Sequence, residues 1–188
     1  MSASTPHVTK NKALPGAPAP LFSHDMADFQ LELPDEKATV RFGAGFASLL
    51  RPGDVVCLSG PLGAGKTTLA RGVIAALTSG EEASSPTFAL VETYEAGDFA
   101  LWHFDLYRLE KAEDVWELGL EEAFAEGASL VEWPERIAAH IPPTGLLLRL
   151  EPSGEGRRLT ARGDEDWARR LEGAGLFQRR ESLNKNEE

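Results

Sequence analysis

The chemistry of this chain is predicted by eight consecutive residues, Gly60-Pro61-Leu62-Gly63-Ala64-Gly65-Lys66-Thr67, which match the spacing of a phosphate-binding loop. The glycines allow the backbone to turn so that successive N–H groups converge on phosphate oxygens at the start of a helix. Lys66, in a loop expected to face solvent, would reach the β- and γ-phosphates, and Thr67 offers a hydroxyl for Mg²⁺. Thr68 follows in the first helical turn, near the α-phosphate side. The loop therefore predicts a nucleotide ligand.

Acidic side chains for the same site are expected where two apolar strands end, at Asp105 and Glu132. In α/β sheets the carboxyl ends of the strands face the phosphate loop, where acids hold or orient Mg²⁺ and water. Strand ends also carry solvated acids without such a role, but two of them beside this loop favour the functional interpretation. Thr87 lies in the connection after the loop helix. Its hydroxyl is expected to approach the γ-phosphate or its metal, as in a switch segment. Alone it would be an ordinary turn residue.

A phosphate-binding loop requires a strand before it and a helix after it, and the sequence predicts both. Residues 54–59 are predicted to form a buried parallel strand, and residues 68–77 a helix that ends before Gly80. Later predicted elements are a hairpin around residues 96–98, short helices within 111–124, a buried strand at 128–133, a helix at 134–140, a second hairpin of 146–150 with 158–162, and a helix at 166–171.

The segment before the loop predicts a strand and a helix. Residues 29–33 alternate between apolar and polar, as in an edge strand, and Asp35 is placed to cap a helix that reaches about residue 50. Gly43 and Gly45 lie inside that helix, where each costs about 1 kcal/mol relative to Ala. They predict a close backbone contact, unless the helix simply tolerates them.

Length and composition favour one domain. A chain of 188 residues with 42% hydrophobic content buries one substantial core. The predicted fold class is α/β: a three-layer phosphate-loop NTPase-type domain with a mostly parallel central sheet, antiparallel hairpin additions and helices on both faces. We expect this domain at residues 28–175, between an N-terminal extension (1–27), predicted to be disordered, and a charged tail (176–188).

Charge and composition narrow the function classes. A net charge of −11 repels phosphate backbones, so work on nucleic acid is expected to proceed through a partner. The sequence has no apolar run of membrane-spanning length, and its first thirty residues lack the pattern of a signal or transit peptide, which predicts a cytosolic protein. Cys57 is the only cysteine and is expected to pack as a small core residue.

Four segments, in this order and at these distances, resemble the TsaE family, also called YjeE, the small phosphate-loop ATPases of bacterial tRNA threonylcarbamoyladenosine synthesis. The resemblance covers about residues 29 to 165, and other phosphate-loop families share only the first segment. The segments are the phosphate loop, Ser85-Pro86-Thr87-Phe88, His103-Phe104-Asp105-Leu106-Tyr107-Arg108-Leu109 and Val131-Glu132-Trp133-Pro134-Glu135.

The resemblance implies a partner-dependent ATPase. TsaE proteins bind ATP and Mg²⁺ and act with TsaB and TsaD, which transfer a threonylcarbamoyl group to adenosine 37 of tRNAs that read codons beginning with A. TsaE does not modify the base itself, and its hydrolysis is expected to reset the TsaB–TsaD complex between turnovers. The acidic charge of the chain and its isolated Arg108 add two expectations: contact with tRNA only through the complex, and slow hydrolysis without the partners.

The resemblance also implies roles for individual residues. By position, Lys66 matches the family's phosphate-binding lysine, and Thr67 matches its Mg²⁺ ligand. Glu132 matches the acidic residue of the metal site, and Asp105 matches the aspartate implicated in hydrolysis. Thr39 matches a nucleotide-contacting position near the start of the first helix. Trp133 matches a tryptophan beside the site, although packing at a strand end is an equally good role for it.

Two other function classes share the loop. A small-molecule kinase needs an acceptor pocket and usually a mobile lid with several arginines. The sequence shows no such lid, and Arg108 is an isolated candidate for this role. A nucleotide-sensing interaction module would use ATP only to order a binding surface. Asp105 and Glu132 favour hydrolysis, and a measurement of phosphate release separates the three classes.

Overall fold

The computed structural model describes residues 27–78 and 89–179, and Gly80 and Thr87 lie outside the described residues. Within these ranges the strands form one sheet in the order β3-β4-β5-β2-β6-β7-β1-β8. The strands are β1 (Ala27–Leu33), β2 (Val55–Ser59), β3 (Val91–Ala96), β4 (Phe99–Asp105), β5 (Ala128–Glu132), β6 (Leu146–Ser153), β7 (Gly156–Gly163) and β8 (Gln178–Arg179).

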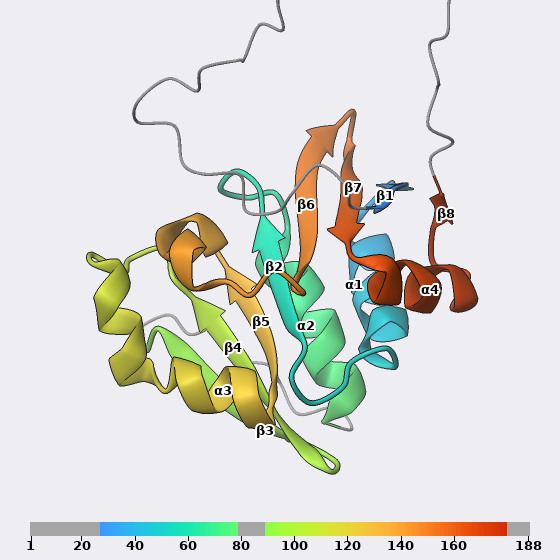
Figure 1. Cartoon of the computed structure of the whole chain (residues 1–188). Helices are drawn as coiled ribbons and strands as arrows, with labels where there is room; N and C mark the ends of the chain where they lie inside the picture. Colours follow the sequence, from blue (N-terminus) through green and yellow to red (C-terminus); the bar gives the residue numbers. More distant parts are fainter. Residues whose placement is uncertain (1–26, 79–88, 180–188) are drawn as a thin grey trace, which may run out of the picture.

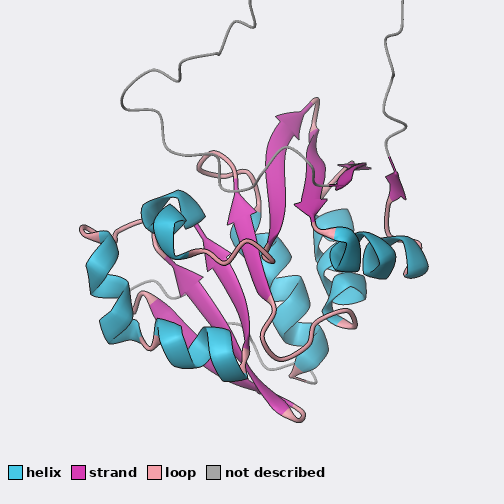
Figure 2. Ribbon diagram, in the orientation of Figure 1, coloured by secondary structure: helices cyan, strands magenta, loops and turns pink. Residues whose placement is uncertain are grey.

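The middle of the sheet is parallel and both of its sides are antiparallel. Strands β4, β5, β2 and β6 run parallel to one another. Antiparallel β3 extends this centre beside β4, and β7, β1 and β8 extend it beside β6. The predicted α/β class, with a parallel centre, hairpin additions and helices on both faces, is confirmed (Figures 1 and 2).

Helices cover both faces of the sheet. Apolar residues of α1, α2 and α4 pack in one core cluster, and those of η1, α3 and η2 pack in a second cluster on the opposite face. The helices are α1 (Glu36–Ala47), α2 (Lys66–Leu77), η1 (Ala112–Leu118), α3 (Leu120–Glu126), η2 (Pro134–His140) and α4 (Glu165–Gly173), of which η1 and η2 are 3-10 helices. Every helix in the described ranges is too short or too polar to cross a bilayer.

Strand β2, which leads into the phosphate loop, is buried over its whole length. Val56 and Leu58 belong to the core cluster with α1 and α2, whereas Val55 and Cys57 belong to the opposite cluster. A strand buried on both faces needs a continuous apolar run. Each fully buried valine or leucine side chain in it stabilises the fold by about 1.5–3 kcal/mol. Cys57 is thus the core residue that the sequence predicts, and burial raises the pKa of its thiol.

Two glycines let α1 lie directly against the loop helix α2. A Cβ on Gly43 would come within 2.5 Å of the carbonyl oxygen of Leu69, and one on Gly72 within 2.5 Å of that of Val40. The close backbone contact predicted at Gly43 is therefore confirmed. Gly45 instead faces a side chain, because its Cβ would lie 3.2 Å from Leu176.

The end of the described chain differs from the prediction. Residues 176–179 were expected to begin a charged tail, but Phe177 is buried, with its ring 5.2 Å from that of Phe42 and 5.8 Å from that of Phe29. Strand β8 then pairs with β1, so the predicted edge strand has an outer neighbour at Phe29 and Gln30. A strand of two residues is too short to give a periodic pattern, and charged residues follow it directly.

The second hairpin is also longer than predicted. Its strands pair as far as Ser153 and Gly156, so that only Gly154 and Glu155 form the turn. Proline, serine and glycine in this stretch indicate a five-residue loop from sequence alone. The longer strands matter for the site because the extra pairs include Arg157, which lies beside the phosphate loop.

Candidate functional site

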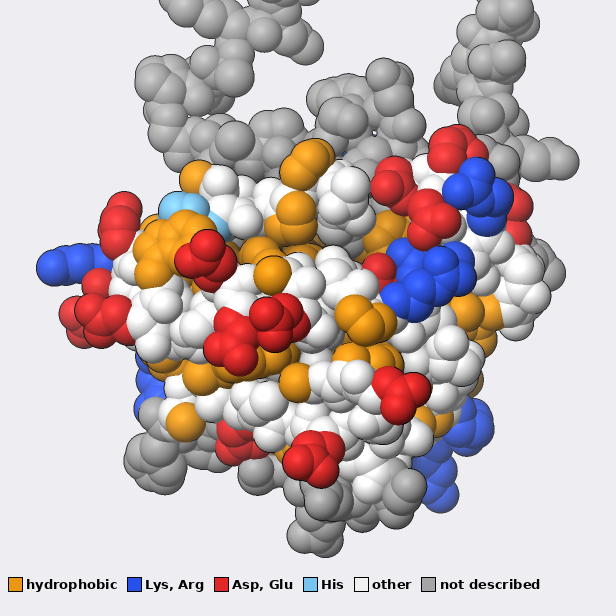
Figure 3. Space-filling model, turned by 60° about the horizontal axis from the view of Figure 1, so that its bottom comes forward, with side chains coloured by type: hydrophobic (Ala, Val, Ile, Leu, Met, Phe, Trp, Pro, Cys, Tyr) orange, Lys and Arg blue, Asp and Glu red, His pale blue; other side chains and the backbone are white. Residues whose placement is uncertain are grey.

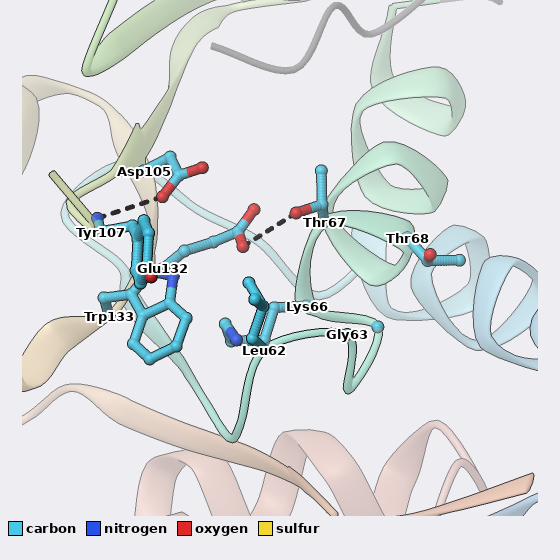
Figure 4. A pocket seen from close by; sticks show the side chains of 10 residues that line it. Leu62, Gly63, Lys66, Thr67, Thr68, Asp105, Tyr107, Glu132 and Trp133 are labelled. Atoms are coloured by element: carbon cyan, nitrogen blue, oxygen red, sulfur yellow. Dashed lines mark hydrogen bonds between the residues drawn. The ribbon is translucent and has the colours of Figure 1, made fainter. Parts of the chain in front are cut away.

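A pocket of about 230 Å³ lies between the phosphate loop and the carboxyl ends of β4 and β5 (Figure 4). The parallel strands bring Asp105 and Glu132 to one edge of the sheet, where they are register partners. The predicted residues that line the pocket are Leu62, Gly63, Gly65, Lys66, Thr67, Thr68, Asp105, Glu132 and Trp133.

Other predicted residues lie just outside this lining. Gly60 and Pro61 turn their carbonyl oxygens toward the Lys66 ammonium, and the side chain of Ala64 is buried in the core. Thr39 is buried on α1, and its hydroxyl accepts a hydrogen bond from Arg157. Thr87 falls outside the described residues, so its predicted switch role stays a prediction.

The start of α2 presents backbone donors without a side-chain acceptor. Gly65 takes the N-cap position with a φ of 100°, and in the described structure no side chain caps this helix. A left-handed φ suits glycine, and a Cβ here would also lie 2.7 Å from a guanidinium nitrogen of Arg157. Uncapped N–H groups and the helix dipole would favour an anion such as phosphate at this end of α2.

Lys66 is buried, which differs from the solvent-facing position expected from sequence. Its ammonium donates to the carbonyl oxygens of Gly60 and Pro61, at 2.9 and 3.0 Å. The nitrogen also lies 3.9 Å from the ring centroid of Trp133, and only 4% of the residue is exposed. Burial lowers the pKa of Lys66, and the nearby charge of Glu132 opposes that shift.

Trp133 covers Lys66 by means of an unusual backbone conformation. Its φ of 60° and ψ of 49° are left-handed, and it is the one non-glycine residue with positive φ in the described ranges. Such a conformation costs about 1–3 kcal/mol and is typical of functional sites. It follows Glu132 directly and precedes the first turn of η2, so the turn aims the indole at the loop lysine while the carboxylate reaches Thr67 (Figure 4).

The carboxylate of Glu132 joins the loop to the sheet. The hydroxyl of Thr67 donates to its Oε2 at 3.0 Å, and Nε2 of His103 lies 3.0 Å from its Oε1. Asp105 ends the neighbouring strand, and its Oδ1 accepts from the backbone N–H of Tyr107 at 3.2 Å. Burial raises the pKa of Asp105, the Tyr107 N–H lowers it, and the charge of Glu132 raises it further.

The oxygen atoms of Thr67 and Glu132 are suitable ligands for Mg²⁺ bound together with phosphate oxygens. Thr67 and Glu132 offer a hydroxyl and a carboxylate, which are hard oxygen ligands. Within residues 27–78 and 89–179, no group of three or more His, Cys, Asp or Glu side chains could hold an ion. Mg²⁺ usually takes one or two carboxylates plus substrate phosphates, so this sparse set suits it.

Sequence reasoning missed Tyr107 and Arg157, and it gave no role to His103. Tyr107 lines the pocket, and its ring centroid lies 4.9 Å from that of Trp133. Tyr107 could have been predicted from the sequence, because it lies two residues after Asp105 within a segment of family resemblance. Arg157 donates to the hydroxyl of Thr39 at 2.8 Å and lies against Gly65, but no spacing in the sequence links residues 118 positions apart.

Comparison with known proteins decides the family. Residues 33–160 match the family model described as "Threonylcarbamoyl adenosine biosynthesis protein TsaE". This chain belongs to the TsaE family. The family functions in the biosynthesis of threonylcarbamoyladenosine, a modification of tRNA. The resemblance stated from the sequence is therefore confirmed.

Individual TsaE proteins agree with this assignment. The chain is 44% identical over 124 residues to the tRNA threonylcarbamoyladenosine biosynthesis protein TsaE of Rickettsia bellii, covering 65% of this chain and 85% of that protein. It is 39% identical over 127 residues to the TsaE protein of Bacillus subtilis, covering 66% and 77%. The crystal structure of Bacillus subtilis YdiB superimposes with a TM-score of 0.68 at 28% identity, over 81% of this chain and 97% of that one.

Proposed function

We propose that this chain is a Mg²⁺-dependent ATPase that works in the cytoplasm with TsaB and TsaD in the threonylcarbamoylation of adenosine 37 of tRNA. The proposal rests chiefly on the hydrogen bond between Thr67 and Glu132, which ties the phosphate loop to an acidic strand end. This pair places a hydroxyl and a carboxylate beside the uncapped start of α2. Thr67 and Glu132 would hold Mg²⁺ if the ion binds together with a nucleotide.

Each residue then has a distinct task. The α2 N–H groups and Lys66 bind the phosphates, and Lys66 exchanges its bonds to the loop carbonyls for bonds to phosphate oxygens. Bound Mg²⁺ would neutralise negative charge on the nucleotide phosphates. Asp105 orients the attacking water, and its raised pKa improves it as a proton acceptor. Arg157, through its place against Gly65, adds positive charge beside the loop.

Transfer to the tRNA base is assigned to the partners. The chain carries a net charge of −11, and acidic side chains are spread over the face drawn in Figure 3, where Lys and Arg form one patch right of centre and smaller groups toward the margins. Such a surface binds a phosphate backbone weakly. We therefore expect weak tRNA binding and no threonylcarbamoyl transfer by the isolated chain.

The test is phosphate release from ATP by the purified chain, alone and with the TsaB–TsaD complex. We expect slow release alone and stimulation by the complex, because partner docking completes the neutralisation of transition-state charge. ATP-dependent phosphorylation of a small acceptor would identify a kinase. Tight ATP binding without phosphate release under either condition would identify a nucleotide sensor.

The two acids are expected to separate binding from turnover. Glu132→Ala should weaken the Mg²⁺-dependent part of ATP affinity, because it removes the carboxylate next to Thr67. Asp105→Ala should leave ATP affinity nearly unchanged and lower hydrolysis about 100-fold, the usual contribution of a positioned base. Calorimetric titration and single-turnover hydrolysis measure the two effects. Equal losses of affinity and rate in both variants would contradict the division.

Arg157→Ala is expected to weaken ATP binding about tenfold, which is the value of one charge-assisted hydrogen bond to phosphate. The neighbouring Arg158→Ala is the matched control, because Arg158 is exposed and paired with Glu32 at 2.7 Å. Thr39→Val keeps the volume of the side chain and removes the hydroxyl that holds Arg157. It should give a smaller loss in the same direction. Identical affinities of the Arg157 and Arg158 variants would remove Arg157 from the site.

A further inference from the structure

The carboxylate of Glu132 is held from two sides. Thr67 donates to Oε2 and His103 contacts Oε1, each at 3.0 Å, and Glu132 itself is 2% exposed. His103 lies on β4 and is fully buried. Its register partner is Leu130, two residues before Glu132 on β5, so neighbouring parallel strands fix the two side chains relative to each other.

The surroundings of His103 determine which ring nitrogen carries the proton. Nδ1 is buried and has no hydrogen-bond partner in the described structure, whereas Nε2 faces a carboxylate oxygen. A proton on Nδ1 alone would leave a buried N–H without an acceptor, which costs about 1–3 kcal/mol. It would also set the lone pair of Nε2 against the lone pairs of Oε1. The Nε2–H tautomer avoids both, and it makes His103 the donor to Glu132.

We propose that His103 is a positioning residue that fixes the orientation of the Glu132 carboxylate and presents Oε2 to Thr67 and to the metal. The consequence for the metal rests on the function proposed above, whereas the hydrogen bond itself does not. The last torsion of a glutamate side chain is broad and has no sharply preferred value. A hydrogen bond from His103 on β4 to Oε1 restricts this torsion, and Oε2 then faces Thr67 and the phosphate loop.

The alternative is that His103 only fills space in the core, and two substitutions separate these roles. His103→Leu fills the space and removes the donor, whereas His103→Gln keeps an N–H near the position of Nε2. Loss of a hydrogen-bond partner behind a metal ligand typically costs 10–100-fold in metal affinity. His140→Leu is the control, because His140 stacks edge-on against Trp116 in η1 and lies outside the pocket lining.

The first measurement is the Kd of a fluorescent ATP analogue, N-methylanthraniloyl-ATP, in Mg²⁺ and in EDTA. We expect His103→Leu to leave the Kd in EDTA within about threefold of wild type and to reduce the gain in affinity from Mg²⁺ at least tenfold. His103→Gln should restore most of that gain. Full Mg²⁺ dependence in His103→Leu, or equal losses in the Leu and Gln variants, would overturn the proposal.

The second measurement needs no nucleotide. Long-range ¹H–¹⁵N correlation spectra of the histidine rings should show His103 as the Nε2–H tautomer, with a ring resonance that shifts in Glu132→Gln. A His103 ring protonated on Nδ1 only, or unaffected by Glu132→Gln, would overturn the proposal whatever the chain binds. If wild-type chain gains no affinity from Mg²⁺ while the spectra show the expected tautomer, the proposed metal dependence fails and the hydrogen bond to Glu132 stands.

Discussion

Lys66→Ala is expected to raise the Kd for ATP about 10²–10⁴-fold, because two charge-assisted hydrogen bonds to phosphate are each worth about 1.5–3 kcal/mol. The substitution removes the ammonium that now lies between two loop carbonyls and the indole of Trp133. Calorimetric titration with ATP and Mg²⁺ measures the loss.

The fold should survive this substitution. The partners of the ammonium belong to the loop and to the first residues after β5, outside the packed centre of the sheet. We expect the midpoint of thermal unfolding to change by only a few degrees, about the effect of 1 kcal/mol in a domain of this size. Lys111→Ala, an exposed lysine before η1, is the control. Near-normal ATP affinity of Lys66→Ala would overturn the assignment of the phosphate loop.

Arg170→Ala is expected to lower the free energy of unfolding by about 3–5 kcal/mol, because it leaves a largely buried carboxylate without its partner. The guanidinium of Arg170 donates to both carboxylate oxygens of Asp54, at 2.7 and 3.0 Å, and to the carbonyl oxygen of Leu49. Side-chain exposure is 9% for Arg170 and 12% for Asp54. This pair fastens α4 to the residue before β2. Chemical denaturation measures the loss.

The chain supplies a matched control next to this residue. Arg169 is 72% exposed and pairs with Asp166 only at the surface, so Arg169→Ala should change stability by less than about 1 kcal/mol. In a double-mutant cycle, Asp54→Ala with Arg170→Ala should cost less than the sum of the single changes, since the second change removes the unpaired charge left by the first. Strict additivity would show that the two side chains do not interact.

The sequence predicts which residues meet at the centre of the candidate site, because the local order of elements places them there. A parallel strand, a glycine-rich loop and a helix in succession place Lys66 and Thr67, and the carboxyl ends of parallel strands meet at one edge of the sheet. Asp105 and Glu132 could therefore be paired across 27 positions without a structure. The burial of Lys66 was missed, because it depends on the left-handed backbone of Trp133, which composition does not reveal.

The rest of the site depends on antiparallel register. Arg157 reaches Gly65 because β7 pairs back along β6 for two residues more than its proline and glycines indicate. His103 begins a segment of family resemblance, but its contact with Glu132 follows only when β4 and β5 are placed side by side. Strand β8 is set by the packing of Phe177 rather than by a pattern of its own. Such features follow from which distant segments become neighbours, and local propensity contains little of that information.

The pairing of β1 with β7 has a consequence for synthesis on the ribosome. The partners of residues 27–33 are residues 157–163, so after leaving the exit tunnel β1 waits for about 130 further residues. At 5–20 residues per second this interval is about 6.5–26 s, during which β1 lacks strand β7, with which it pairs. Thr39 and Arg157 meet only after the same delay. A nascent chain released before β7 emerges would therefore hold a complete phosphate loop and lack the arginine beside it.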